Sequence, residues 1–115
     1  MEKFIETHSF DQRLQESTKI KLKYPNSVCT IVEKSPTSKI ARIDKKKFLI
    51  PKDLTIGQFI YVIRKRINLR PSEAIFIFTN NTLPPSTCTF GNIYDKYQNE
   101  DGFLYMEYSG ENVFG

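Results

Sequence analysis

Two repeating patterns of apolar and polar residues run along the chain, and the helical pattern appears three times. The first helix begins at Ser9, three positions before Gln12, which is the spacing of a capping box. Pro25 ends the pattern. Phe10 and Leu14 give this helix only a weak apolar face. We therefore expect it to lie on the outside of the fold.

The strongest helical signal covers residues 55–69, with Thr55 as a suitable N-cap. A shorter helical pattern follows over residues 89–98. The long helix carries a core stripe with Phe59 at its margin, and Val62 lies further round on the same side. The stripe itself consists of Ile56, Ile60, Ile63 and Ile67.

Strand-like segments separate these helices. Residues 27–35 are rich in β-branched side chains, and residues 45–53 form a short segment that Pro51 ends. Residues 73–81 are almost continuously apolar, which predicts a buried central strand. Residues 102–109 form the last strand. The order helix, β, β, helix, β, short helix, β predicts a single domain of the α+β class.

Composition limits the possible functions. The 115 residues carry a net charge of +4 with a pI near 9.1, which favours acidic partners without choosing among them. Cys29 and Cys88 lack metal-ligand spacing, and His8 is the only histidine, so we expect no metal, no cofactor and no catalytic activity. We find neither a signal peptide nor an apolar run of about 18 residues that could span a membrane.

The segment KKKFLIP has two interpretations. Phe48 and Ile50 should point to one side of the strand, and Lys47 and Leu49 to the other. Three lysines can protect a sheet edge from aggregation, or they can attract an acidic peptide that adds a strand to that edge. The surplus apolar residues on the long helix can likewise be the shoulder of the core or part of a peptide-binding surface. Periodicity alone leaves both pairs of alternatives open.

Basic residues also gather at the end of the long helix, in the run RKRINLR, and on the first helix at Lys19, Lys21 and Lys23. A solvated basic face explains both groups. Binding of nucleic acid would require aromatic residues interleaved with the basic ones, and Tyr61 alone does not supply a stacking platform. We therefore expect no nucleic-acid partner.

Several segments in the same order resemble the autophagy ubiquitin-like modifiers, the family of GABARAP and of microtubule-associated protein light chain 3. They are KIKLKYPNSV, DKKKFLIPKDLTIGQFIYVIRKRINL, NNTLPPSTCTFGNIY and EDGFLYMEYSGENVFG. The resemblance extends from about His8 to Gly115. It implies a ubiquitin-like β-grasp fold with two additional N-terminal helices. The implied divisions are an N-terminal helical extension at 1–24, the ubiquitin-like core at 25–108 and a flexible tail at 109–115.

The resemblance also implies a function. A ubiquitin-like activating enzyme and a conjugating enzyme would pass the chain on as a thioester and join Gly115 to phosphatidylethanolamine. Glycine suits this terminal position because it lacks a Cβ atom that would obstruct attack on its carbonyl. Phe114 and Arg66 would assist the activation of the chain and its processing. A cysteine protease would carry out the processing. The protein would be cytoplasmic, and autophagosomal once lipidated. The alternative is an unconjugated module that binds peptides or tubulin.

The same resemblance implies a two-pocket peptide dock on the second strand for adaptors and cargo receptors with aromatic-x-x-aliphatic motifs. Its aromatic pocket would be lined by Glu16, Ile20, Lys47, Leu49 and Phe103. Its aliphatic pocket would be lined by Phe48, Ile50, Pro51, Leu54, Phe59 and Val62. Lys45 and Lys47 would attract acidic flanks of the peptide, and Arg66 would help to hold it. Ser27 and Cys29 stand where many relatives carry arginine and proline, which would loosen the preference for acids, alter the aromatic pocket or place a reactive thiol there.

Overall fold

A computed structural model describes residues 3–112 of the chain. Helices and strands follow one another in the order α1 (Phe4–Thr7), α2 (Phe10–Lys23), β1 (Ser27–Lys34), β2 (Lys47–Pro51), α3 (Ile56–Arg66), β3 (Phe76–Phe78), α4 (Phe90–Tyr97) and β4 (Leu104–Ser109). This order confirms the α+β class and the two N-terminal helices. No helix in the described part of the chain is long and apolar enough to cross a membrane.

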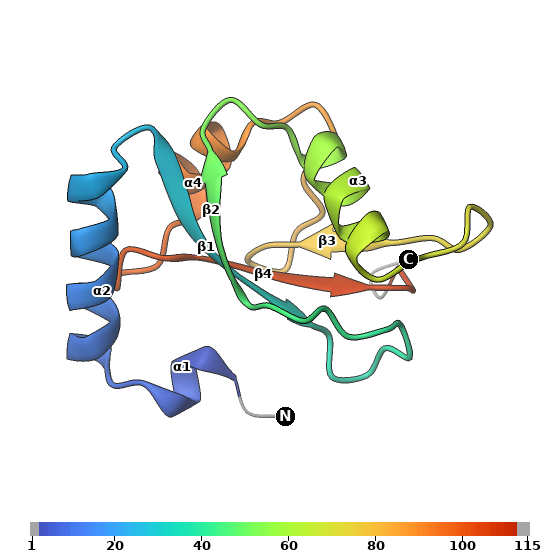
Figure 1. Ribbon diagram of the computed structural model, residues 1–115, viewed down its shortest axis with the longest axis horizontal. Coiled ribbons are helices and arrows are strands. Elements are labelled where there is room, and N and C mark those ends of the chain that lie inside the picture. The colour runs from blue at the N-terminus through green and yellow to red at the C-terminus, as the bar shows by residue number, and fades with distance from the viewer. Residues whose placement is uncertain (1–2, 113–115) are drawn as a thin grey trace.

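The four strands form one sheet in the order β2-β1-β4-β3. The two central strands, β1 and β4, run parallel, and each pairs with its outer neighbour in antiparallel fashion. In Figure 1, α1 and α2 lie on one side of the sheet and α3 lies on the other. The sheet therefore has two covered faces, and β2 and β3 form its edges.

Each face of the sheet has its own apolar cluster, because alternate residues of β1 point in opposite directions. Val28 and Val32 belong to the main core, together with apolar side chains of α3 and α4. Cys29 and Ile31 point the other way, into a smaller cluster beneath α1. The smaller cluster attaches the N-terminal helices to the sheet.

Local capping signals in the sequence are confirmed. The side chain of Ser9 accepts a hydrogen bond from the Gln12 amide, and Thr55 accepts one from Gln58, so capping boxes start α2 and α3. The long helix ends earlier than predicted, at Arg66. Asn68 adopts a positive φ of 52° just beyond it, in the left-handed region.

Three sequence expectations are corrected by the packing. The apolar run at 73–81 yields only the short β3, which lies at an edge of the sheet and not at its centre. A continuous apolar run indicates that both faces of a strand are covered. It does not indicate whether the strand has hydrogen-bonded neighbours on both sides or on one side only. Phe59 is not marginal: it is 2% exposed, whereas Ile60 and Ile67 are only partly buried.

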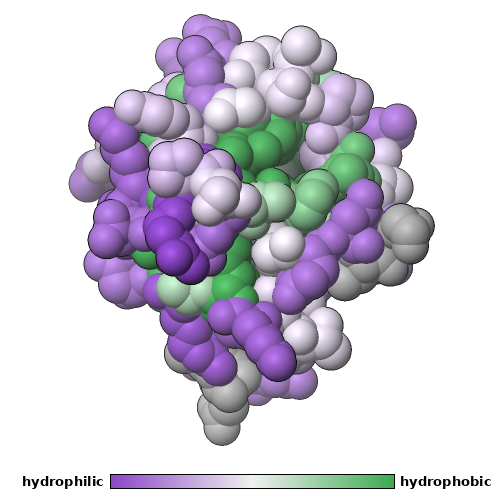
Figure 2. Space-filling model, turned by 90° about the vertical axis from the view of Figure 1, so that its right-hand side faces the viewer, coloured by the Kyte–Doolittle hydropathy of each residue, from purple (hydrophilic) through white to green (hydrophobic). Residues whose placement is uncertain are grey.

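The third correction concerns α2. Its expected apolar residues, Phe10 and Leu14, are exposed, and the helix instead buries Arg13 and Ser17. The inward face of this helix is therefore polar. Its buried polar side chains need hydrogen-bond partners in the part of the molecule that the helix packs against. Figure 2 shows the opposite side of the molecule from α2, where hydrophilic side chains surround a hollow in which apolar surface is visible.

Candidate functional site

The outer edge of β2 is open, because β2 pairs with β1 on one side only. Along this strand Phe48 and Ile50 are buried, while Lys47, Leu49 and Pro51 are exposed. This alternation confirms the orientation expected from the sequence. An open strand edge can hydrogen-bond to the backbone of an incoming extended peptide.

A cavity of about 190 Å³ lies between α2 and β2. Of the five residues predicted for the aromatic pocket, the structure brings Ile20, Lys47, Leu49 and Phe103 together in its wall. Glu16 is not part of the wall, but its carboxylate pairs with the Lys47 ammonium at 2.7 Å. The remaining wall residues are Tyr24, Cys29, Thr30, Lys45 and Phe48.

Basic side chains border this cavity and the start of β2. The Lys45 ammonium lies 4.9 Å from the centre of the Phe48 ring, and the Arg66 guanidinium lies 5.7 Å from it. Arg66 also pairs with Asp44 at 3.2 Å, which fixes the end of α3 to the segment preceding β2. The rim is thus positively charged at the end where the strand begins.

The residues predicted for the aliphatic pocket divide into two layers. Phe48, Ile50 and Phe59 are buried and form a packed floor, in which the rings of Phe48 and Phe59 meet edge to face at 5.4 Å. Pro51 and Val62 are exposed above this floor. Leu54 is partly buried beside them. At this pocket the second layer would contact a ligand and the buried three would support it from below, although Phe48 also lines the aromatic cavity.

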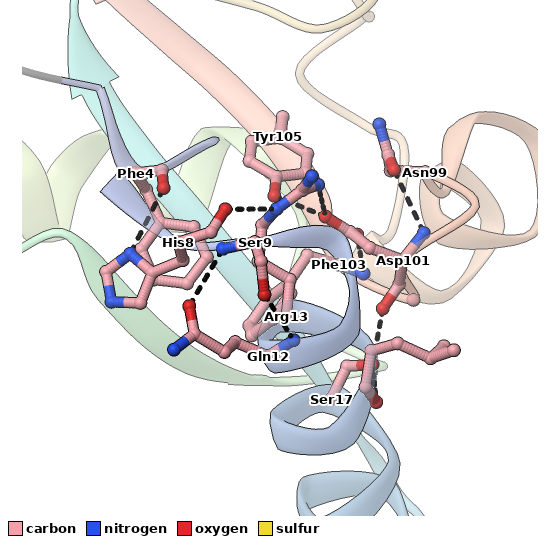
Figure 3. Close-up of polar contacts among 12 residues, drawn as sticks. Phe4, His8, Ser9, Gln12, Arg13, Ser17, Asn99, Asp101, Phe103 and Tyr105 are labelled. Atoms are coloured by element: carbon pink, nitrogen blue, oxygen red, sulfur yellow. Dashed lines mark hydrogen bonds and ion pairs between the residues drawn. The ribbon is translucent and has the colours of Figure 1, made fainter. Parts of the chain in front are cut away.

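A buried polar network sets the position of α2, and with it one wall of the cavity (Figure 3). The Arg13 guanidinium donates to Asp101 Oδ2 at 2.6 Å, and the Tyr105 hydroxyl donates to the same oxygen at 2.5 Å. Ser17 Oγ donates to the Asp101 carbonyl at 2.5 Å, and the Phe103 amide donates to Asp101 Oδ1 at 2.8 Å. Burial, followed by the bond to Asp101, raises the pKa of Tyr105.

Sequence reasoning missed this network. It did not single out Arg13 and Ser17, which are four residues apart and therefore on one face of α2. That spacing of polar residues on a helix with a weak apolar face is the signal that was available. The partner could not be found from it, because Arg13 and Asp101 are 88 positions apart in the chain.

Cys29 lies at the base of the cavity. Its thiol donates to the Gly102 carbonyl at 3.3 Å, and that carbonyl also accepts a bond from the Tyr94 hydroxyl at 2.7 Å. Burial raises the pKa of the Cys29 thiol, which keeps it protonated at neutral pH. Cys29 therefore shapes the cavity, and the expectation of a reactive thiol at this position is not supported by its environment.

The C-terminal residues singled out by the sequence, Phe114 and Gly115, lie outside the described residues. The root of the tail is described, however, and it is held to the loop between β1 and β2. Ser38 Oγ donates to Glu111 Oε2 at 2.8 Å and accepts from the Gly110 amide at 3.0 Å. Hydrogen bonds from Ser38 and Ser109 hold the pKa of Glu111 below its usual value.

Comparison with known proteins places this geometry in a family. Residues 12–115 match the family described as "Autophagy protein Atg8 ubiquitin like". Autophagy-related protein 8b of Arabidopsis thaliana is 55% identical over 109 residues, which cover 95% of this chain and 89% of that protein. Autophagy-related protein 8 of Emericella nidulans is 53% identical over 113 residues, covering 98% and 96%.

Solved structures agree with the sequence matches. Trypanosoma brucei ATG8 superposes with a TM-score of 0.90 at 44% identity, covering 100% of this chain and 99% of that chain. Plasmodium falciparum Atg8, solved in complex with a Plasmodium falciparum Atg3 peptide, superposes with a TM-score of 0.88 at 35% identity, covering 97% and 98%. The ubiquitin-like fold is therefore confirmed, and so is the resemblance to GABARAP and light chain 3. The chain belongs to the Atg8 family of ubiquitin-like autophagy proteins.

Proposed function

We propose that this Atg8-family protein is conjugated through Gly115 to phosphatidylethanolamine on autophagic membranes. There it recruits adaptors and cargo receptors through the peptide dock on β2. The observation that carries the docking half of the proposal is the cavity of about 190 Å³ beside an open strand edge. The protein would be cytoplasmic before conjugation and autophagosomal after it. In this pathway it is the substrate of other enzymes and not itself an enzyme.

The dock would work by addition of a strand. The backbone of an extended peptide would pair with the free edge of β2, and its aromatic side chain would enter the cavity between α2 and β2. Its aliphatic side chain, three positions later, would rest on Pro51, Leu54 and Val62. Lys45 and Lys47 would attract acids that flank the motif. Main-chain pairing would supply affinity, and the two side-chain contacts would supply specificity.

The conjugation half rests on family membership and on the chemistry of Gly115, whose carbonyl no Cβ atom obstructs. The Gly115 carboxylate attacks the α-phosphate of ATP and releases pyrophosphate, which makes the acyl adenylate an acyl donor; an enzyme thiolate then displaces AMP to give a thioester. The lipid amine then attacks the thioester carbonyl, forming an amide and releasing the thiol. The relative from Plasmodium falciparum was solved with an Atg3 peptide. This supports a peptide contact between the present protein and its own conjugating enzyme.

A reconstituted reaction tests the proposal. It contains the chain, cognate activating and conjugating enzymes, ATP and vesicles with phosphatidylethanolamine. We expect a lipid adduct that is absent without ATP and absent for Gly115→Ala. If enzymes that are active on another modifier form neither thioester nor adduct with this chain, the alternative holds. The protein would then be an unconjugated module that binds peptides or tubulin.

A further inference from the structure

A second cavity, of about 280 Å³, adjoins the aromatic pocket. It lies where the end of α2, the start of β1, the residue after β2 and helix α4 meet. Cys29 belongs to the walls of both cavities, so they are neighbours on either side of one side chain. The complete wall of the second cavity consists of Lys21, Pro25, Ser27, Cys29, Lys52 and Tyr94.

The charge in this wall is uncompensated. Lys21 and Lys52 contribute two ammonium groups, and the wall contains no carboxylate. Among residues 3–112, no carboxylate oxygen lies within 4.0 Å of the ammonium nitrogen of either lysine, so neither lysine forms an ion pair there. Asp101, the nearby buried acid, is already bound to Arg13. Lys47, on the rim of the first cavity, differs in this respect, because Glu16 pairs with it.

The two lysines also project from fixed backbone. The Lys52 amide donates to the Asn26 carbonyl at 3.1 Å, and the Lys52 carbonyl accepts from the Gly91 amide at 3.0 Å. Lys21 stands in the last turn of α2, with its ammonium 5.0 Å from the centre of the Tyr94 ring. The backbone of Lys52 and the ring beside Lys21 thus keep the roots of both side chains at this cavity, while the side chains themselves are exposed and accessible to a ligand.

We infer that this cavity is an anion-binding subsite that receives a carboxylate side chain of a peptide held in the dock. The inference rests on the proposed function, because the dock brings the peptide to the neighbouring cavity. Because Cys29 lines both cavities, a peptide held in the first lies beside the two lysines of the second, and the Ser27 hydroxyl in the wall can donate a further hydrogen bond. The subsite would thus add a preference for acids to the affinity of the two anchors.

The test uses three peptides with the same aromatic-x-x-aliphatic motif. One has neutral flanks, one has two glutamates before the aromatic residue, and one has two glutamates after the aliphatic residue. Binding of each is measured by calorimetry to the wild-type chain, to Lys52→Gln and to Lys21→Gln. Lys96→Gln is the matched control, because Lys96 is an exposed lysine on α4 that lines a different cavity.

We expect Lys52→Gln and Lys21→Gln each to weaken one of the acidic peptides about fivefold, which is the upper end for a charge pair at exposed residues such as these. The neutral peptide should bind all four proteins equally, and the control should leave every affinity unchanged. Acidic attraction to Lys45 and Lys47 is present in all four proteins and therefore cancels from the comparison.

Two results would overturn the subsite. In one, the acidic peptides bind Lys52→Gln and Lys21→Gln as tightly as wild type; in the other, Lys96→Gln loses as much affinity, which would indicate diffuse charge attraction. Failure of the dock looks different, since the neutral peptide would then not bind wild type at all. If an acidic peptide still bound through Lys52 in that case, the subsite would stand without the dock. If no peptide bound, both proposals would fall.

Discussion

At the scale of single residues, the site depends on which side chains the fold leaves free. Leu49 is 42% exposed at the mouth of the cavity, whereas its neighbours Phe48 and Ile50 are buried, and Phe48 belongs both to the core and to the cavity wall. A substitution at Leu49 therefore changes the ligand surface with little effect on folding, while one at Phe48 would change both. Variants for testing the dock should come from the exposed positions.

Leu49→Ala is the clearest residue-scale test of the dock. We expect it to weaken binding of an aromatic-x-x-aliphatic peptide by about tenfold, because it removes apolar contact around the aromatic anchor. Calorimetric titration measures the change. Leu22→Ala is the matched control, since Leu22 lies on α2 with 81% of its surface exposed and outside the cavity wall. Equal affinities for the two variants would show that the cavity is not where the peptide binds.

At the scale of elements, the position of α2 depends on the loop that precedes β4. Gly102 adopts a φ of +90° in this loop, where a side chain is strained. A Cβ atom at this position would lie 2.4 Å from Ser17 Oγ, on the buried side of α2. The helix approaches the loop closely because residue 102 has no side chain.

Gly102→Ala should therefore push α2 away from the sheet. We expect a loss of about 2 kcal/mol in the free energy of unfolding, from backbone strain and displacement of Ser17. Urea denaturation measures it. Gly110→Ala serves as the comparison, because a Cβ atom there meets its nearest neighbour at an ordinary 3.6 Å. The explanation fails if both alanine variants unfold at the same urea concentration.

At the scale of the whole molecule, the contacts that attach the N-terminal helices to the rest of the fold include an apolar contact group and a buried polar network. Phe4 supplies the first, in the cluster with Cys29, Ile31 and Phe103. The ion pair between Arg13 and Asp101 supplies the second. The main core contains none of the described residues 3–24. This separation is compatible with the proposed division into an extension and a core, which remains a prediction.

Asp101→Ala should weaken this attachment strongly. It leaves the guanidinium of Arg13 in a nearly buried position without its partner, at a cost of about 3–5 kcal/mol in stability. Thermal unfolding followed by circular dichroism would measure the loss. Asp95→Ala, at an exposed position on α4, should unfold like wild type. If the two variants had similar midpoints, the buried pair would not be what holds α2 in place.

The sequence by itself determined those features that depend on neighbours in the chain. The capping boxes at Ser9 and Thr55 and the alternation along β2 arise from contacts within a few residues, so their patterns can be read directly. The same holds for the basic charge and for the family, because the resemblance is carried by several segments at fixed spacing. The aromatic pocket was named through that resemblance, and four of its five residues do meet at one cavity.

Only the tertiary structure decided what depends on segments far apart in the chain. It placed β3 at an edge, moved Phe59 into the core and joined Arg13 to Asp101 across 88 positions. It also brought Lys21 and Lys52 to one cavity, although the sequence shows them only as members of separate charged segments. Hydrophobic periodicity reports whether a residue is covered, but not by what. The partners of a side chain are fixed only when the sheet and its helices pack together.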